Sequence, residues 1–345
     1  MANEYDVQKK GIAKFLDYLC LTPLGAIGFL ILMIFPLFPP FNQDYLLRWF
    51  ILAAIMGAGS MAFDFSAGYI AVVNFGFAAF VGLGAYTSAI LANDTPLLIV
   101  QPGISPWIGM WIGALVAGFV GFLLGILTLR LRGIFAACMA WFVGIALMGA
   151  ARNMMDLTRG ALGLHPPRLL ETAENLPYYY IIFVMMLVTY VTLRMVTKTR
   201  MGLAFKAIGQ NMDAAKTSGI NPTRYRIINF TVSSALAGWI GAFYAHFIGI
   251  LTPDFMHTAK TVEFLVIAYI GGRGTLWGGF AVAFPFIWFT EMLRSNFDYL
   301  PGINLLIYGL ILILIMIYYA GGMAQFFQYL VDKYKDNPTI RWLTT

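Results

Sequence analysis

Ten long apolar segments follow one another along the chain, and they limit its fold more than any other feature. Most of them hold close to the ~20 apolar residues that a helix needs to cross a bilayer. We expect the helices over 21–39, 46–67, 69–92, 106–128, 133–151, 178–197, 227–249, 261–271, 275–293 and 302–320. The sequence therefore predicts an all-α polytopic membrane protein with about ten transmembrane helices, within a range of roughly eight to ten.

The composition supports this interpretation. Of the 345 residues 60% are hydrophobic and 11% are charged, against ~25% charged in soluble domains. A soluble core could not hide so much apolar surface, which excludes a soluble enzyme, a disordered protein and a disulfide scaffold. The net charge of +6 does not indicate a nucleic-acid partner, because in a membrane protein the placement of Lys and Arg matters more than their sum. We expect lipid as the main surrounding and no nucleic acid.

The basic residues predict the orientation. Ten crossings put both termini on one side of the membrane, and an excess of Lys and Arg marks the cytoplasmic side. With both termini inside, 16 basic residues are expected in the cytoplasm: Lys9, Lys10, Lys14, Arg130, Arg132, Arg194, Lys198, Arg200, Lys206, Lys216, Arg224, Arg226, Arg273, Lys333, Lys335 and Arg341. Six are expected outside: Arg48, Arg152, Arg159, Arg168, Lys260 and Arg294. The sequence therefore predicts an N-in, C-in protein.

Three regions are expected. Residues 1–20 predict a cytoplasmic or interfacial helix, 21–320 a single transmembrane domain, and 321–345 a cytoplasmic tail. Within the domain, the segment 261–271 is too short for a full crossing and runs into Gly271, Gly272, Arg273 and Gly274. We therefore expect a broken or re-entrant element near 261–275, because irregular backbone at membrane depth survives where protein or water satisfies it.

Small residues recur every four positions in two of the predicted spans. One stripe is Gly109, Gly113, Ala117, Gly121 and Gly125, and the other is Ala237, Gly241 and Ala245. Such spacing lets helix backbones approach closely. It predicts a compact bundle without indicating its function.

No constellation of catalytic or metal-binding residues stands out. The sequence has no HExxH motif, no Gly-x-Ser-x-Gly elbow and no paired carboxylates at helical spacing, and its three histidines lie far apart. Of these, His246 and His257 are expected near a membrane edge. Ionisable residues inside spans are the usual functional candidates; here they are Asp64, Glu263, Glu291 and, near span ends, Arg48 and Arg273. We expect no catalytic site and no metal site in this chain.

The polar stretch 198–226 is long for a connection between tightly packed spans. Ala204, Ile208 and Ala215 share one helical face, Gly219 suits a helix C-terminus, and Asn221-Pro222 suits a turn. The stretch predicts a short amphipathic helix over 202–218 on the cytoplasmic face. Such a helix binds either lipid phosphates or a soluble partner, and its surface, rich in Ala, Gly and Asn, favours a partner.

A set of motifs in a fixed order resembles one transporter family. The motifs are Arg200-x-Gly202, Ala207-Ile208, Asn211, Ala214-Ala215 and Gly219-Ile220-Asn221; the glycine-rich run 68–91; LRLRGIFAA over 129–137; TRGALGL over 158–164; SSALAGWIGAFYAH over 233–246; and IGGRGTLWGG over 270–279. Together they resemble the branched-chain amino acid permeases of binding-protein-dependent ABC importers, of the LivM type. The likeness covers roughly residues 45–320.

The resemblance implies the partners and the location. Such a permease lies in the prokaryotic inner membrane as a multi-pass protein. It pairs with a second related permease, two cytoplasmic ATPases and an extracytoplasmic solute-binding protein. ATP and Mg²⁺ are bound by the ATPases, so no cofactor is expected in this chain. The sequence agrees in one respect: it holds no Gly-Lys-Ser/Thr, and hence no P-loop.

The resemblance also implies two sets of site residues. The ATPase-coupling set is Arg200, Gly202, Ala207, Ile208, Asn211, Ala214, Ala215, Gly219, Ile220 and Asn221. The substrate-pathway set is Asp64, Asn74, Gly76, Thr158, Gly160, Glu263, Gly271, Gly272, Arg273 and Gly274. For the pathway residues, local packing or helix capping is the competing interpretation.

Several positions depart from the family pattern. Ala71, Asn74 and Phe77 stand where a second Gly, a Ser and a His are common, and Gly209-Gln210 stands where Arg-Glu is usual. The expected substrate is a branched-chain amino acid, with urea, short amides or aromatic acids as alternatives in the same transporter class. A stand-alone channel or secondary carrier is the alternative of another class.

Overall fold

The computed structural model describes residues 23–37, 43–93, 102–128, 131, 133–172, 174–296, 303–318 and 321–323. Within these ranges the chain is almost entirely helical, and its strand-like pairing is a single bridge between Leu164 and Leu251. The expected N-terminal helix 1–20 lies outside the described residues, as does nearly all of the expected tail 321–345. The helices are α2 (Pro23–Ile34), α3 (Asp44–Ala67), α4 (Phe77–Ala92), α5 (Pro106–Leu127), α6 (Ile134–Asn153), α7 (Met155–Thr158), α8 (Asn175–Lys198), α9 (Arg200–Gln210), α10 (Met212–Thr217), α11 (Pro222–Ile248), α12 (Thr258–Gly271), α13 (Trp277–Asn296) and α14 (Ile303–Tyr318).

Every apolar segment of the sequence overlaps one of these helices. Among the described residues, five are both long and apolar enough to cross a bilayer: α3, α5, α6, α8 and α11. Two of the remaining helices are clearly too short. α4 has 16 residues and α12 has 14, so they extend about 24 and 21 Å, less than the ~30 Å of the hydrocarbon layer.

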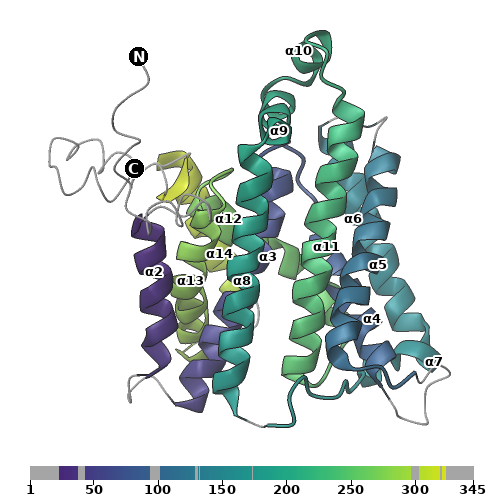
Figure 1. The fold of residues 1–345 in the computed structure, drawn as a ribbon, viewed down its shortest axis with the longest axis vertical. Coiled ribbons are helices and arrows are strands. Elements are labelled where there is room, and N and C mark those ends of the chain that lie inside the picture. The colour runs from purple at the N-terminus through teal and green to yellow at the C-terminus, as the bar shows by residue number, and fades with distance from the viewer. Residues whose placement is uncertain are drawn as a thin grey trace, which may run out of the picture.

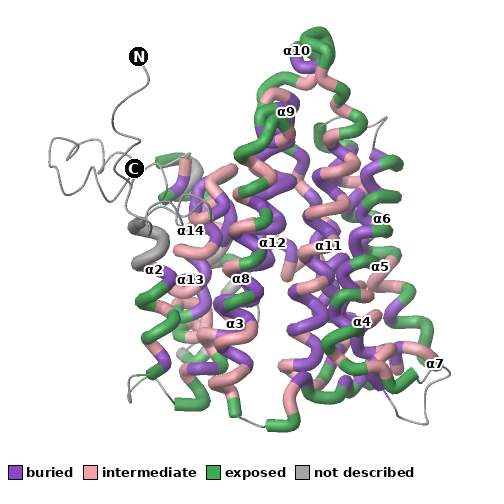
Figure 2. The backbone as a smooth tube through the Cα atoms, viewed as in Figure 1, coloured by how far each residue is buried: buried purple, intermediate pink, exposed green. Residues whose placement is uncertain are grey.

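The outer surface of the bundle is apolar where a soluble protein would be polar. α5 exposes Leu115 and Phe119, and α6 exposes Ile134, Phe135 and Phe142. Figure 2 shows exposed residues along the outward sides of these helices and buried residues toward the centre. Large apolar side chains in such numbers on the surface suit lipid or another membrane subunit.

The expected continuous helix over 69–92 is wrong. The backbone leaves α3 at Ala67, and α4 begins only at Phe77. In between, Ala71 takes a left-handed φ of 55°, which an L-residue adopts at a cost. The side chain of Asn74 accepts a hydrogen bond from the N–H of Gly76 at 3.0 Å, so it competes with helical bonding and favours a helix start.

The helices α4, α5 and α11 meet through small residues, as the stripes predicted. A β-carbon on Gly84 would overlap the backbone of Gly238, one on Gly113 would overlap Gly84, and one on Gly241 would overlap the carbonyl of Val81. Each of these glycines therefore allows two backbones to touch. In lipid the hydrophobic effect does not drive helices together, so close packing of this kind stabilises their association instead.

Two parts of the chain repeat one arrangement in opposite directions. α3 is followed by the non-helical connection 68–76 and the short helix α4, and α11 is followed by the connection 249–257 and the short helix α12. Figure 1 shows that α3 runs toward the end of the bundle that carries α9 and α10, whereas α11 runs away from it. Such opposed halves are common in transporters.

The two short helices begin beside one another inside the bundle. The backbone N–H of Ala78, in the first turn of α4, donates to Oγ1 of Thr261 in the first turn of α12 at 3.0 Å. The rings of Phe77 and Phe264 also meet edge-on, with their centroids 5.4 Å apart. From this meeting point α4 runs toward one end of the bundle and α12 toward the other (Figure 1).

Candidate functional site: a protruding helical corner and polar clusters within the bundle

The α9–α10 segment projects from one end of the bundle (Figure 1). The sequence predicted one helix over 202–218, and this is wrong in one respect. The helix breaks at Asn211, whose Oδ1 accepts hydrogen bonds from the N–H groups of Asp213 and Ala214 at 3.0 Å each. An Asn side chain that caps a new helix start ends the preceding helix. Two short helices therefore meet at an angle in this corner.

An aromatic cluster fixes α9 to the bundle. Phe205 is fully buried, and its ring meets Phe65 of α3 at 5.4 Å and Tyr225 of α11 at 5.8 Å, edge-on in both cases. Lys206 Nζ lies 5.7 Å from the centroid of the Tyr69 ring. α9 thus contacts α3, α11 and the start of the connection 68–76.

Gly209 makes the closest of these contacts. A β-carbon at this position would overlap the carbonyl oxygen of Tyr69. Any displacement of α9 toward the bundle therefore pushes directly on the backbone of the connection 68–76. Since that connection leads into α4, the corner is in direct contact with a segment that enters the interior.

The turn from α10 to α11 uses the expected glycine. Gly219 has a φ of 83°, and the N–H of Ile220 donates to the carbonyl of Ala215 at 3.0 Å, a common way to end a helix. Asn221-Pro222, expected as a turn, instead starts α11: Oδ1 of Asn221 accepts from the N–H of Arg224 at 3.3 Å. α11 therefore begins five residues before the expected span 227–249.

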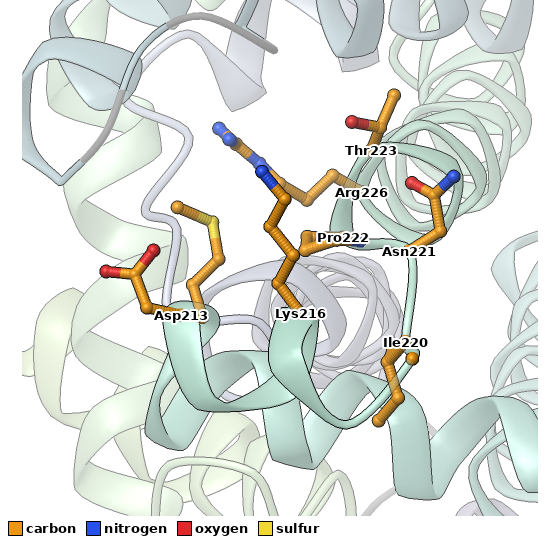
Figure 3. Close-up of a pocket in the computed structure, with 9 residues that line it drawn as sticks. Asp213, Lys216, Ile220, Asn221, Pro222, Thr223 and Arg226 are labelled. Atoms are coloured by element: carbon orange, nitrogen blue, oxygen red, sulfur yellow. The ribbon is translucent and has the colours of Figure 1, made fainter.

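A cavity of about 500 Å³ lies between α10 and the start of α11. Its lining includes Asp213, Lys216, Asn221 and Arg226, and Figure 3 shows the side chains of Lys216 and Arg226 reaching toward one another across it. Arg226 is buried and donates from Nη1 to the carbonyl of Leu131 at 3.1 Å. Among the described residues, its Nε and Nη2 find no hydrogen-bond partner.

The coupling residues divide between inside and outside. Gly202, Ile208 and Ala215 are buried, Ala207 and Ile220 are partly buried, and Arg200, Asn211, Ala214, Gly219 and Asn221 are exposed. Sequence reasoning missed Leu203, whose side chain is 69% exposed on the same corner. Its signal was its place on the face of α9 opposite the buried residues Ala204 and Ile208.

The structure brings Asp64 together with the glycine-rich turn between α12 and α13. The buried carboxylate accepts hydrogen bonds from the N–H of Gly274 at 2.8 and 3.0 Å and from the N–H of Leu276 at 3.2 Å. Arg273 donates from Nε to the carbonyl of Ala67 at 3.2 Å. Gly271 touches the backbone of Gly278, and Gly272 ends α12. The carboxylate thus holds this turn against the end of α3.

The other pathway candidates lie elsewhere. Asn74 and Gly76 precede α4 inside the bundle, and within the part of the chain that the structure describes, Nδ2 of the buried Asn74 has no hydrogen-bond partner. Thr158 and Gly160 lie at the far end, beyond α6, where Oγ1 of Thr158 bonds the carbonyl of Ala151 at 2.6 Å and accepts from the N–H of Gly160 at 3.2 Å. Glu263 pairs with Lys260 in α12. The ten residues therefore form four separate clusters.

His246, predicted near a membrane edge, lies in the last turn of α11 and is fully buried by protein. Its Nδ1 lies 2.7 Å from the carbonyl of Pro167, and its Nε2 lies 2.8 Å from Oγ of Ser88. Because a carbonyl can only accept, Nδ1 donates, and in the neutral ring Nε2 accepts from the serine hydroxyl. The ring thus ties α11 to α4 and to the loop that follows α7.

Comparisons with known proteins agree with this architecture. The model of a family described as branched-chain amino acid transport system / permease component matches residues 45–316. The high-affinity branched-chain amino acid transport system permease protein LivM of Salmonella typhimurium is 24% identical over 276 residues, which are 72% of this chain and 62% of that protein. LivM of Escherichia coli gives the same figures. The chain thus matches less than two thirds of the length of either LivM protein.

A shorter match is closer in sequence. The nucleoside ABC transporter permease protein NupC of Lactococcus lactis is 40% identical over 74 residues, which are 21% of this chain and 22% of that protein. No solved structure matches the chain.

Proposed function

The chain belongs to the family of branched-chain amino acid transport system permease components, and from this premise we propose that it carries branched-chain amino acids across the membrane. Members of the family are the membrane-spanning components of ABC importers. The projecting corner of α9 and α10, which contacts the interior at Gly209 and Tyr69, supports the role in an ABC importer. The proposal of a branched-chain amino acid rests on the likeness to the LivM proteins. Urea, short amides and aromatic acids remain the alternatives within this class.

The proposed orientation places the α9–α10 end in the cytoplasm, with about ten crossings. The uneven distribution of basic residues in the sequence supports it. One basic residue needs a different place: Lys260 was assigned to the outer side, but it lies in the first turn of α12 inside the bundle. Without Lys260 on the outer side, the excess of basic residues at the α9–α10 end is larger.

We propose that two cytoplasmic ATPases bind at the α9–α10 corner and that a second permease subunit completes the transporter. The chain has no P-loop sequence, so ATP and Mg²⁺ would be bound by the ATPases. Leu203 and Ala214 are exposed on the corner. Leu203 would give an ATPase an apolar contact, and the small side chain of Ala214 would let α10 fit closely in a groove of the ATPase. An extracytoplasmic binding protein would dock at the opposite end, over the loops near 93–105, 152–177 and 295–301 and the part of 250–260 that precedes α12.

In the proposed mechanism, closure of the ATPases moves α9, and the bundle rocks between inward-open and outward-open states. The contact between Gly209 and Tyr69 carries the movement into the connection 68–76. From there it reaches the N-terminus of α4, where Asn74 and Gly76 are the proposed pathway residues. The turn over Gly271, Gly272, Arg273 and Gly274, held by Asp64, closes the same end, and Thr158 and Gly160 shape the other.

Co-purification of the ATPase subunits tests the proposal. Leu203→Glu and Ala214→Arg change exposed positions of the corner, so the chain is expected to insert and fold while ATPase binding is lost. Leu162→Glu is the matched control, because Leu162 is 74% exposed at the opposite end. ATPase that stays bound in both corner variants would refute the proposal, and solute flux through the purified chain without ATP would favour a channel or secondary carrier.

A further inference from the structure

An ion pair occupies the first turn and a half of α12. Nζ of Lys260 donates to both carboxylate oxygens of Glu263, at 3.0 and 2.9 Å. The two side chains remain 40% and 17% exposed. The pair is therefore formed within the chain but is not covered by it.

The pair lies near the middle of the bundle. Gly59 of α3 faces the ring of Phe264. Along α3, Gly59 lies about 22 Å from the start of the helix and about 12 Å from the end of the helix. Lys260 precedes Phe264 by one helical turn, about 6 Å further from the α9–α10 end. The contact between Oγ1 of Thr258 and Nε1 of Trp141, in the first half of α6, places the start of α12 at the same level.

A charged side chain at this depth does not face hydrocarbon. Placing one at the centre of a bilayer costs about 2.5–3.5 kcal/mol or more, and such residues line water-filled cavities or contact other protein. The exposed part of Lys260 thus marks a place where water, a solute or the other permease subunit approaches α12.

We propose that Lys260 and Glu263 bind the opposite charges of a zwitterionic amino acid as it crosses the midpoint of the membrane. This inference rests on the proposed function. The ammonium of lysine has three donors, and two are used by Glu263. The third is available to the α-carboxylate of the solute, while the free lone pairs of the Glu263 carboxylate accept from its α-ammonium.

The arrangement suits a zwitterion for electrostatic reasons. The ion pair has no net charge, and neither has the solute. Their contact therefore places four charges of alternating sign side by side, and no unbalanced charge is buried. The N-terminus of α12 carries a partial positive charge, which favours a carboxylate on the side of Lys260. A neutral amide such as urea would use neither charge fully.

The test uses the complete transporter in proteoliposomes, with the binding protein loaded with leucine. Lys260→Met and Glu263→Gln are compared with the wild type for leucine imported per ATP hydrolysed. We expect each variant to keep its ATPase subunits and the stimulation of hydrolysis by the binding protein. Import per ATP should fall about tenfold, since each variant removes one charged hydrogen bond to the solute.

Two controls separate this inference from others. Asp44→Asn removes an exposed acidic residue at the start of α3, about 22 Å along that helix from Gly59, and should import leucine as the wild type does. The exchange Lys260→Glu with Glu263→Lys keeps an ion pair and should assemble with the ATPases and recover part of the import, because a zwitterion can bind in either direction.

The outcomes are distinct. Unchanged import per ATP in both single variants, with a stable complex, would overturn the inference and leave the proposed function intact. A chain that never assembles with ATPases, even as wild type, would overturn the proposed function itself. If the single variants fail to assemble and the exchanged pair assembles but imports nothing, the pair is structural and the inference is wrong.

Discussion

Gly209 in α9 lies directly against the carbonyl oxygen of Tyr69, at the start of the connection that leads to α4. The contact joins the most protruding part of the molecule to a non-helical segment of its interior. It is possible because Gly209 has no side chain, so the backbone of α9 can approach the carbonyl of Tyr69. Its consequences are open to direct measurement.

Gly209→Ala should destabilise the protein. The added β-carbon would overlap the Tyr69 oxygen, and overpacking of this kind costs about 1–3 kcal/mol. We expect a lower Tm in detergent and weaker coupling of ATP hydrolysis to transport. Gly149→Ala is the control, because a β-carbon there meets nothing within 4 Å. Equal Tm values for the two variants would contradict the contact.

Asp64→Ala should destabilise more than Asp64→Asn. The carboxylate accepts from the N–H groups of Gly274 and Leu276, and removing it leaves both donors without a partner, at about 1–3 kcal/mol each. An asparagine oxygen can still accept from one of them. Thermal unfolding of the three proteins measures the order, with the exposed Asp156→Asn as a control. A Tm for the alanine variant equal to that of the wild type would exclude a structural role for the carboxylate.

Ser88→Ala and His246→Gln should loosen the loop that follows α7. His246 bridges Ser88 and the carbonyl of Pro167, and a buried hydrogen bond contributes about 0.5–1.5 kcal/mol. Hydrogen exchange in residues 163–170 should quicken in both variants, more in His246→Gln because it breaks both contacts. A double-mutant cycle should show coupling between the two sites. Additive effects would mean that the serine and the histidine act independently.

Ala71→Gly should stabilise the protein. Ala71 is exposed and has a φ of 55°, a conformation that costs an L-residue about 1–2 kcal/mol and glycine little. Part of this gain is lost because glycine makes the unfolded chain more flexible. We expect a small rise in Tm. Ala146→Gly, at an exposed position within α6, should lower the Tm, since glycine weakens a helix by about 1 kcal/mol. A fall in both variants would mean that the left-handed turn is not under strain.

The sequence predicted the positions of the helices well because hydropathy depends on composition over many residues. It could not show that 69–76 is not helical, since this stretch is as apolar as the helix that follows. The available signals were Asn74 and Asn211, each placed to cap a helix start, and both are weak without knowledge of the partner N–H groups. Asn211 was identified as a site residue, but the break that it causes was missed.

The candidate site was predicted less completely, and for a physical reason. Asp64 and Gly274 are 210 positions apart, and no local pattern shows that they meet. Lys260 was placed in an outer loop because a lysine lowers local hydropathy. In the structure Lys260 forms an ion pair with Glu263, three residues later. The neutral pair can lie deeper in the bundle than a single lysine charge could.

The hydrogen bond between Ala78 and Thr261 has a consequence for biogenesis. The two residues are 183 positions apart, so α4 leaves the ribosome long before its capping hydroxyl is synthesised. Until then the start of α4 must keep water, the translocation machinery or a chaperone as its partner. The first half of the protein is therefore expected to wait in the membrane incompletely folded, and a chain truncated before α12 should be degraded rather than accumulate.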